Sequence, residues 1–495
     1  MAVDTHPLQS QLPKLVTRPL VAGRWVDGRP DLPVRDPTTG GCIASVSSAT
    51  EEDVAAAIAA GHTAERAWRT VPAVERASLC ATIADQLQSN SADIATIISS
   101  EVGKPLAESV AEVEVSSSFF RWASGQAPRA AGKVLASPSP SLALSTTVSP
   151  VGLVLAITPW NFPLAMVARK IAMPLALGCP IILKPSEQAP LAALFLAKLI
   201  QDAGLPDGVL SVLPMGPGTA TARLLADERV RHVSFTGSAT TGKRIHALLA
   251  GRSSVGWSAE LGGNAPLLVL HDADVERAAA VTAIVKFRNA GQTCVAPNRI
   301  IVADSSYERF VEAFSVVVKQ TVVGPWRDPA ATMGPLKSDE RAASVRGHLD
   351  DAELKGARII GGAPCSPVGG QSGRFVDPAI VLDWTPDMLL AQEETFGPVA
   401  PICRGKSVGE MVELANMTNY GLAAYVFGSD LGLVTHVVDA LEYGVIGVNQ
   451  LASTFANAPI GGWRGSGSGI ESGIEGTDQY LRPKLVATDV GPPLA

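Results

Sequence analysis

The sequence lacks the charge pattern and the long apolar runs that direct a protein to nucleic acid or to a membrane. Its formal net charge is −7 with no basic excess, which argues against nucleic acid as the main partner. No uninterrupted apolar run approaches the roughly 18 residues that a membrane helix needs. Residues 1–15 have neither a signal-peptide core nor an Arg-rich transit character, so we expect a cytoplasmic protein.

Cysteine and histidine are also sparse. The six cysteines are scattered without a CxxC pair, and the seven histidines form no HExxH motif. So few thiols in so long a chain do not make a disulfide framework or a zinc site. The sequence therefore predicts no bound metal.

Apolar residues are plentiful, because the 495 residues are 46% hydrophobic. This length allows two or three domains of roughly 100–200 residues each. Helical spacing dominates the first 130 residues, where Thr50 followed by three acidic residues marks a helix start. Between residues 132 and 150, Ser, Pro and alternating β-formers predict an extended arm, with an ordinary linker as the alternative.

From Val151 onward, short apolar runs alternate with helical runs. Residues 151–158 and 180–184 are predicted strands, and residues 163–178 and 190–204 are predicted helices. This alternation predicts a parallel sheet covered by helices, as in dinucleotide-binding folds, although the usual GxGxxG motif is absent. A second α/β series begins near Leu261.

One glycine turn is suited to phosphate binding. Residues 235–238 read FTGS, with Thr241 and Gly242 in the helix that follows. A strand, a glycine turn and a helix opening with a hydroxyl present N–H groups and a positive helix end to an anion. An ordinary turn is the alternative reading.

A second turn carries a cation and an acid. In ILKPSEQAP, Lys184 and Glu187 follow a predicted strand, and ligands of open parallel sheets lie at such strand ends. A carboxylate there can accept two ribose hydroxyls. A surface turn set by Pro185 and Pro190 is the alternative.

Three further residues have side chains suited to catalysis. Asn161, in PWNFP, is the kind of amide donor that stabilises an oxyanion, or it caps the next helix. Glu260, in ELGG, is a candidate base with a raised pKa, or a member of a structural ion pair. Cys294, in GQTC, lies in a polar junction after a predicted helix, where most free cysteines would be inert.

Taken together, these motifs resemble the aldehyde dehydrogenase superfamily over nearly the whole chain. The matching segments stand in family order: PWNFP (159–163), KPSE (184–187), FTGS (235–238), ELGG (260–263), GQTC (291–294), EETFGP (393–398) and PIGG with SGSG (459–469). The resemblance implies an α/β fold made of three parts. These are a Rossmann-type NAD domain (1–131 and 151–260), an α/β catalytic domain (261–455) and a β oligomerisation arm (132–150 and 476–495).

The resemblance also implies a catalytic scheme. Cys294 would be the nucleophile, acting as the thiolate, and Asn161 would hold the oxyanion with the Cys294 backbone N–H. Hydride transfer to the nicotinamide would leave a thioester, which water activated by Glu260 would hydrolyse to a carboxylic acid.

In that family a further set of residues binds the cofactor. Glu187 and Lys184 hold the adenosine ribose, Ser238 the pyrophosphate and Glu394 the nicotinamide ribose. The Glu187 carboxylate would repel a 2′-phosphate, so we expect NAD as the cofactor, with NADP possible. The full predicted cofactor-binding set is Trp160, Lys184, Ser186, Glu187, Gly237, Ser238, Thr241, Leu261, Glu394 and Phe396.

Two arginines bear on the aldehyde. Arg169 and Arg288 stand where many relatives carry aromatic residues, and the pair resembles the succinate-semialdehyde dehydrogenase branch, in which arginines bind the substrate carboxylate. We therefore expect oxidation of succinate semialdehyde to succinate. The alternative for either arginine is an ion pair with a protein acid.

The chain departs from that branch near the aldehyde pocket. Ala296 replaces a second cysteine, which removes a redox switch, and Ile470 stands where an arginine is usual. Thr454 retains a hydroxyl near the expected substrate carboxylate, whereas Phe455 is bulkier than expected. Another semialdehyde or a neutral aldehyde therefore stays open as the substrate.

Two other classes of function are weaker. A cysteine acyl hydrolase would need Cys294 without a nicotinamide site, and a non-catalytic scaffold would normally lose Cys294, Glu260 or Asn161. The arm has no local partner, and isolated strands need pairing, so we expect a homodimer or homotetramer.

Overall fold

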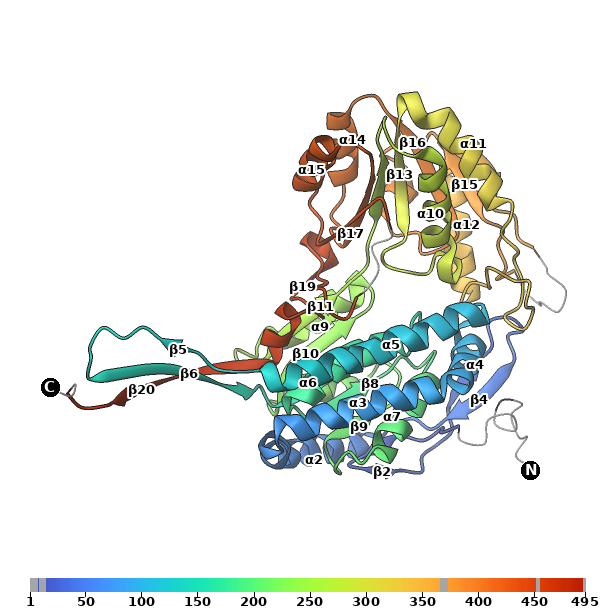
Figure 1. Cartoon of the computed structure of the whole chain (residues 1–495). Coiled ribbons are helices and arrows are strands. Elements are labelled where there is room, and N and C mark those ends of the chain that lie inside the picture. Colours follow the sequence, from blue (N-terminus) through green and yellow to red (C-terminus); the bar gives the residue numbers. More distant parts are fainter. Residues whose placement is uncertain (1–7, 9–14, 366–372, 451–454, 493–495) are drawn as a thin grey trace, which may run out of the picture.

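The computed structural model describes residues 8, 15–365, 373–450 and 455–492. Two lobes are stacked in Figure 1, and a long arm projects from the lower one. Each lobe contains a mixed sheet with helices packed on it, which confirms the predicted α/β architecture.

The lower lobe is built on an eight-stranded sheet, called the first sheet. Its order is β19-β11-β10-β7-β8-β9-β1-β2, and the five strands from β11 to β9 run parallel. In chain order its strands are β1 (Leu20–Val21), β2 (Arg24–Trp25), β7 (Leu153–Ile157), β8 (Ile181–Lys184), β9 (Leu210–Val212), β10 (Val230–Thr236), β11 (Gly256–Glu260) and β19 (Gly467–Ser468).

Helices cover both faces of the first sheet. They are α2 (Glu51–Thr70), α3 (Ala73–Ser89), α4 (Ser91–Val102), α5 (Leu106–Gln126), α6 (Ala165–Leu177), α7 (Leu191–Asp202), α8 (Thr219–Ala226) and α9 (Ala239–Leu249). Alternate residues of β7 belong to different cores: Val154 and Ala156 pack with α3 to α7, and Leu153 and Leu155 pack with α2, α8 and α9. Burial on both faces explains why this strand is apolar at every position.

The upper lobe contains a seven-stranded sheet, the second sheet, in the order β14-β15-β16-β13-β12-β17-β18. Its strands are β12 (Ala265–Val269), β13 (Pro297–Ala303), β14 (Arg358–Gly361), β15 (Ala379–Leu382), β16 (Val399–Gly405), β17 (Ala423–Phe427) and β18 (Val445–Val448). Its helices are α10 (Val275–Phe287), α11 (Tyr307–Val318), α12 (Asp339–Leu354), α13 (Leu389–Gln392), α14 (Val408–Asn416) and α15 (Leu431–Ala440).

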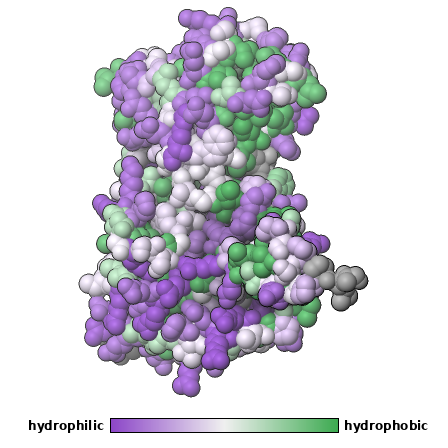
Figure 2. All heavy atoms as spheres, turned by 90° about the vertical axis from the view of Figure 1, so that its left-hand side faces the viewer, coloured by the Kyte–Doolittle hydropathy of each residue, from purple (hydrophilic) through white to green (hydrophobic). Residues whose placement is uncertain are grey.

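The arm is a three-stranded antiparallel sheet of β5 (Val134–Leu135), β6 (Leu142–Pro150) and β20 (Leu481–Asp489). Several of its apolar side chains are exposed, with Val134 at 92% and Leu485 at 63% of full exposure. Figure 2, seen from the side on which the arm projects, shows apolar residues gathered at several places among polar ones.

The N-terminal region differs from the helical expectation. Residues 20–46 form β1, β2 and a hairpin of β3 (Leu32–Arg35) with β4 (Cys42–Val46) before α2 begins. These strands are two to five residues long, too short for their periodicity to stand out in the sequence. Thr50 does start α2, through a reciprocal capping box with Asp53.

Two helices that lead away from strand ends are capped by remote glutamates. Glu112 of α5 accepts hydrogen bonds from the backbone N–H groups of Leu164 (2.9 Å) and Ala165 (3.0 Å), at the start of α6. Glu101 does the same for Leu191 and Ala192 at the start of α7. A carboxylate satisfies free N–H groups and complements the positive helix end. The α3–α5 layer is thereby tied to the strand ends of the first sheet.

No helix in the part of the chain that the structure describes is long and apolar enough to cross a membrane. Within the same residues, no group of three or more His, Cys, Asp or Glu side chains is placed to hold a metal ion.

Candidate active site

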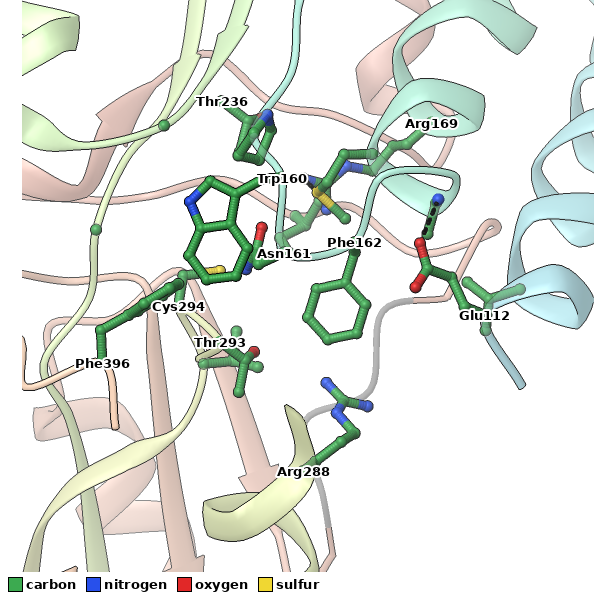
Figure 3. A pocket seen from close by; sticks show the side chains of 18 of the residues that line it. Glu112, Trp160, Asn161, Phe162, Arg169, Thr236, Arg288, Thr293, Cys294 and Phe396 are labelled. Atoms are coloured by element: carbon green, nitrogen blue, oxygen red, sulfur yellow. Dashed lines mark hydrogen bonds between the residues drawn. The ribbon is translucent and has the colours of Figure 1, made fainter. Parts of the chain in front are cut away.

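A cavity of about 360 Å³ lies between the two lobes and brings remote segments together. One side, the strand-end side, is formed by Thr236, Gly237, Ser238, Leu261 and Gly262, where β10 and β11 end. The opposite side, the helix side, is formed by Glu108, Ala111, Glu112, Val115 and Phe119 of α5. In Figure 3 the Cys294 sulfur lies next to the Asn161 side chain, beside the Trp160 ring.

Most of the predicted site residues line this cavity, although they come from segments up to 236 positions apart. They are Trp160, Asn161, Arg169, Gly237, Ser238, Leu261, Arg288, Cys294, Glu394 and Phe396. Lys184, Ser186, Glu187, Thr241, Glu260 and Phe455 do not line it. Thr454 lies outside the described residues.

Cys294 follows a tight left-handed turn at the end of α10. Asn289, Ala290 and Gly291 have φ angles of 51°, 53° and 74°. A Cβ at Gly291 would lie 2.1 Å from the carbonyl oxygen of Gly397, so only glycine fits there. Burial, with a smaller contribution from the Glu394 charge, raises the pKa of the Cys294 thiol to about 12. In this state the thiol is protonated at neutral pH.

Asn161 is bonded across the interface between the lobes. Its Nδ2 donates to the backbone oxygen of Gln292 at 3.0 Å, two residues before Cys294. It forms no cap on α6, whose start is held by Glu112 instead. One Nδ2 hydrogen therefore orients the amide, and the other is free to face the cavity.

Glu260 ends β11 and lies behind the cavity wall. It is 4% exposed, and its Oε1 has no hydrogen-bond partner. Burial first, and then the neighbouring Glu471 charge, raise the pKa of Glu260 to about 8. The raised pKa is the property expected of a general base that works near neutral pH.

The two arginines have different surroundings. The Arg169 Nε lies 2.8 Å from Glu471 Oε2, and Glu471 also contacts Lys170 and accepts a hydrogen bond from Ser234 at 3.0 Å. The Lys170 and Arg169 cations outweigh burial and lower the pKa of Glu471. Arg169 therefore forms an ion pair with a protein acid, which was the alternative to binding the substrate carboxylate.

Arg288 lines the cavity without an ion pair among the described residues, and its Nε is buried without a hydrogen-bond partner. Its guanidinium lies 5.3 Å from the centre of the Phe162 ring, and Figure 3 shows it pointing toward that ring. A half-buried cation of this kind is available to a ligand anion.

Features that suit a dinucleotide lie along the cavity wall. Ser238 caps α9 by accepting from the N–H of Thr241, and Gly237 lies just before it on the cavity wall. The Glu394 Oε1 accepts from Gly263 N–H at 3.0 Å, and burial raises the pKa of Glu394 to about 7. The side-chain oxygen of Thr236 is buried without a partner on the same wall. A helix end for phosphate and a cavity carboxylate for hydroxyl groups fit a nicotinamide dinucleotide.

At the end of β8, Lys184 Nζ lies 3.6 Å from Glu187 Oε2. Ser186 accepts a hydrogen bond from Gln188 N–H and so shapes the turn. Glu187 remains partly exposed, and therefore a ribose can approach it.

Several cavity residues carry no motif and were not predicted. Glu108 comes from the first turn of α5, and Val115 and Phe119 from further along it. Arg341 comes from α12, and its guanidinium lies 5.6 Å from the Phe396 ring centre. Phe396 has a φ of 49° and meets Trp160 edge to face at 5.9 Å. No sequence signal distinguishes these helical residues from ordinary amphipathic positions.

The chain belongs to the aldehyde dehydrogenase family, whose model matches residues 25–486. It is 40% identical over 468 residues to a 3-sulfolactaldehyde dehydrogenase from Pseudomonas putida, covering 94% of this chain and 96% of the relative. It is 38% identical to a mitochondrial succinate-semialdehyde dehydrogenase from Arabidopsis thaliana, covering 98% and 92% of the two chains. The crystal structure of a Staphylococcus aureus betaine aldehyde dehydrogenase in complex with NAD+ superposes with a TM-score of 0.94, at 32% identity and 98% coverage of both chains. The protein is thus an aldehyde dehydrogenase that uses NAD(P).

Proposed function

We propose that this aldehyde dehydrogenase oxidises a small aldehyde that carries an anionic group, with succinate semialdehyde as the first candidate, and that it uses NAD. The observation that carries the proposal is the Arg288 guanidinium on the cavity wall, which forms no ion pair with the residues that the structure describes. Paired with a substrate carboxylate, it would form a charge-assisted, bidentate contact.

In the proposed reaction, the Cys294 sulfur attacks the aldehyde carbon as a thiolate. Since burial holds this thiol protonated, a base must remove its proton before or during attack. The free Nδ2 hydrogen of Asn161 and the Cys294 N–H stabilise the oxyanion that forms. Bound NAD supplies the hydride acceptor, and the substrate is left as a thioester on Cys294.

Glu260 completes the cycle by taking a proton from the water that hydrolyses the thioester. Its raised pKa suits it to that transfer near neutral pH. Because its carboxylate lies behind the cavity wall, either a side-chain rotation or a bridging water has to connect it to Cys294. A hydrolytic base also separates this enzyme from a CoA-acylating one, which would not need it.

Glu187 supports NAD over NADP, since its carboxylate at the end of β8 would repel a 2′-phosphate. A relative from Escherichia coli that is 38% identical carries the name succinate-semialdehyde dehydrogenase [NADP(+)], so both cofactors must be compared.

The relatives' names also include glutarate-semialdehyde and aspartate-semialdehyde dehydrogenases, and both of these named aldehydes carry a carboxylate. The test is an aldehyde panel, with carboxylated and neutral members of matched size, assayed with NAD and with NADP by reduced-cofactor absorbance. Higher kcat/KM for the carboxylated members with NAD is expected. Equal kcat/KM for matched neutral aldehydes would contradict an anionic substrate, and a preference for NADP would contradict the role of Glu187.

We also propose that the first sheet binds the cofactor, that the second sheet carries the nucleophile and that the arm joins subunits into a homodimer or homotetramer. The exposed apolar side chains of the arm support that assembly. Light scattering during gel filtration tests it, and a monomer would contradict it. The cytoplasmic location stays a prediction.

A further inference from the structure

Asn289 occupies the first position of the left-handed turn that leads to Cys294. It is 2% exposed, and its backbone N–H donates to Glu108 Oε2 at 2.8 Å. Its backbone oxygen accepts from Gln292 Nε2 at 2.9 Å. The turn is therefore held from the helix side of the cavity and from within the loop itself.

The Asn289 side chain reaches the oxyanion asparagine as well as its own loop. Its Nδ2 donates to the backbone oxygen of Asn161 at 3.1 Å and to that of Gln292 at 3.3 Å. Asn161 Nδ2 donates in return to the same Gln292 oxygen at 3.0 Å. The two asparagine amides thus form a reciprocal clamp, in which each donates to backbone of the segment on the other side of the lobe interface.

The Asn161 carbonyl has one more donor. Lys104 Nζ, which is paired with Glu112 at 2.7 Å, donates to it at 2.9 Å. The backbone of Asn161 is therefore fixed by two donors, of which Asn289 alone belongs to the segment that carries the nucleophile.

Left-handed backbone alone would also favour asparagine at position 289, because Asn tolerates positive φ better than most residues. The chain offers a comparison in Asn449, which has a φ of 53° and bonds through its side chain to the N–H and oxygen of Gly428. Asn449 lies in the second sheet's lobe, makes no contact with Asn161 and does not line the cavity. Like Asn289, Asn449 has a positive φ that favours asparagine, but it is not bonded to Asn161.

We propose that Asn289 is a positioning residue, whose side-chain amide sets Asn161 at the distance from Cys294 at which it stabilises the oxyanion. This rests on the proposed roles of Asn161 and Cys294. The clamp crosses the lobe interface. Without it, a small shift of one lobe relative to the other would move the Asn161 amide away from the reacting carbon.

The first test replaces the amide and keeps the backbone. Asn289→Gly and Asn289→Asp both tolerate positive φ and keep the N–H that bonds to Glu108, but neither carries the donor. We expect kcat to fall by about 10- to 100-fold with KM for the aldehyde changed by less than about threefold, because the lost contact acts on the transition state. A rise in KM with unchanged kcat would overturn the proposal.

The decisive test is a double-mutant cycle with Asn161→Ala. If Asn289 acts through Asn161, adding Asn289→Gly to Asn161→Ala lowers kcat by less than about twofold more. Losses that multiply in the double variant would mean that Asn289 acts independently, and would overturn the proposal. If the wild type oxidises no aldehyde, the proposed function fails. If Asn161→Ala keeps full activity, the proposed role of Asn161 fails, and the role of Asn289 fails with it.

Asn449→Gly is the matched control, with an expected kcat near that of the wild type. Thermal unfolding of each variant checks that the fold persists, and Asn289→Asp serves if Asn289→Gly does not fold. Failure of both to fold would assign Asn289 a structural role and overturn the proposal.

Discussion

The strand-end side and the helix side of the cavity are built in different ways. On the strand-end side, Gly237, Ser238 and Leu261 follow directly from β10 and β11, so neighbouring residues in short motifs become neighbours in space. On the helix side, Glu108 and Phe119 of α5 meet Arg288 from the other lobe, and no motif joins them. A parallel sheet places its strand ends at one edge whatever the rest of the chain does, whereas a helix side is set by packing. We therefore expect the chemistry common to the family to concentrate at strand ends, and substrate choice to depend on the helix side and on Arg288, which faces it across the cavity.

The largest effect is expected at Cys294, which lines the cavity between its two sides. Cys294→Ala should lower kcat by about 10⁴-fold or more for every aldehyde and with either cofactor, because the nucleophile is lost. Steady-state assays measure the loss, with NAD binding by calorimetry as the control for an intact strand-end side. Substantial residual oxidation would contradict the assignment of the nucleophile.

Glu260→Gln should lower turnover by about 10²- to 10³-fold, while the first equivalent of reduced cofactor still forms in a burst. A base acts only when deprotonated, and burial raises the pKa of Glu260 to about 8. Wild-type turnover should therefore rise as pH increases through about 8, and this rise should vanish in Glu260→Gln. Stopped-flow absorbance and a pH series measure both. A variant without a burst would place Glu260 before hydride transfer.

Replacing each of the two arginines should separate a substrate-binding role from a role in stability. Arg288→Ala should raise KM for succinate semialdehyde by about 30-fold, and should change KM for a neutral aldehyde of similar size by little. Arg169→Ala should instead lower the free energy of unfolding by about 3 kcal/mol, since it leaves the buried Glu471 short of a partner. Steady-state kinetics and thermal unfolding separate the two. Equal effects of Arg288→Ala on both aldehydes would remove the carboxylate anchor.

The smallest effect is expected at Glu187. Glu187→Gln removes the charge that would repel a 2′-phosphate, so kcat/KM with NADP should rise by about fivefold relative to NAD. Lys184→Met serves as a contrast, since it removes the cation and keeps the acid. If the ratio of kcat/KM with NADP to kcat/KM with NAD is unchanged in Glu187→Gln, another residue discriminates against the 2′-phosphate.

Much of the fold followed from local pattern. The apolar runs of β7 and β8, the capping box at Thr50 and the glycine after α7 were readable, because each is decided by neighbours in the chain. The strands between residues 20 and 46 were not predicted, since their length is too short to show a period.

The sequence by itself determined which residues can do chemistry. A thiol, an amide and a carboxylate in GQTC, PWNFP and ELGG are chemical identities that need no coordinates, and they led to the aldehyde dehydrogenase family. The tertiary structure alone decided the states of these groups. It keeps the half-buried Cys294 thiol protonated and places Glu260 near the Glu471 charge. It pairs Arg169 with Glu471, gives Arg288 no ion pair among the described residues, and links Asn161 to Asn289. A pKa or an ion pair depends on burial and on distances between remote segments, and those arise only when the two lobes pack together.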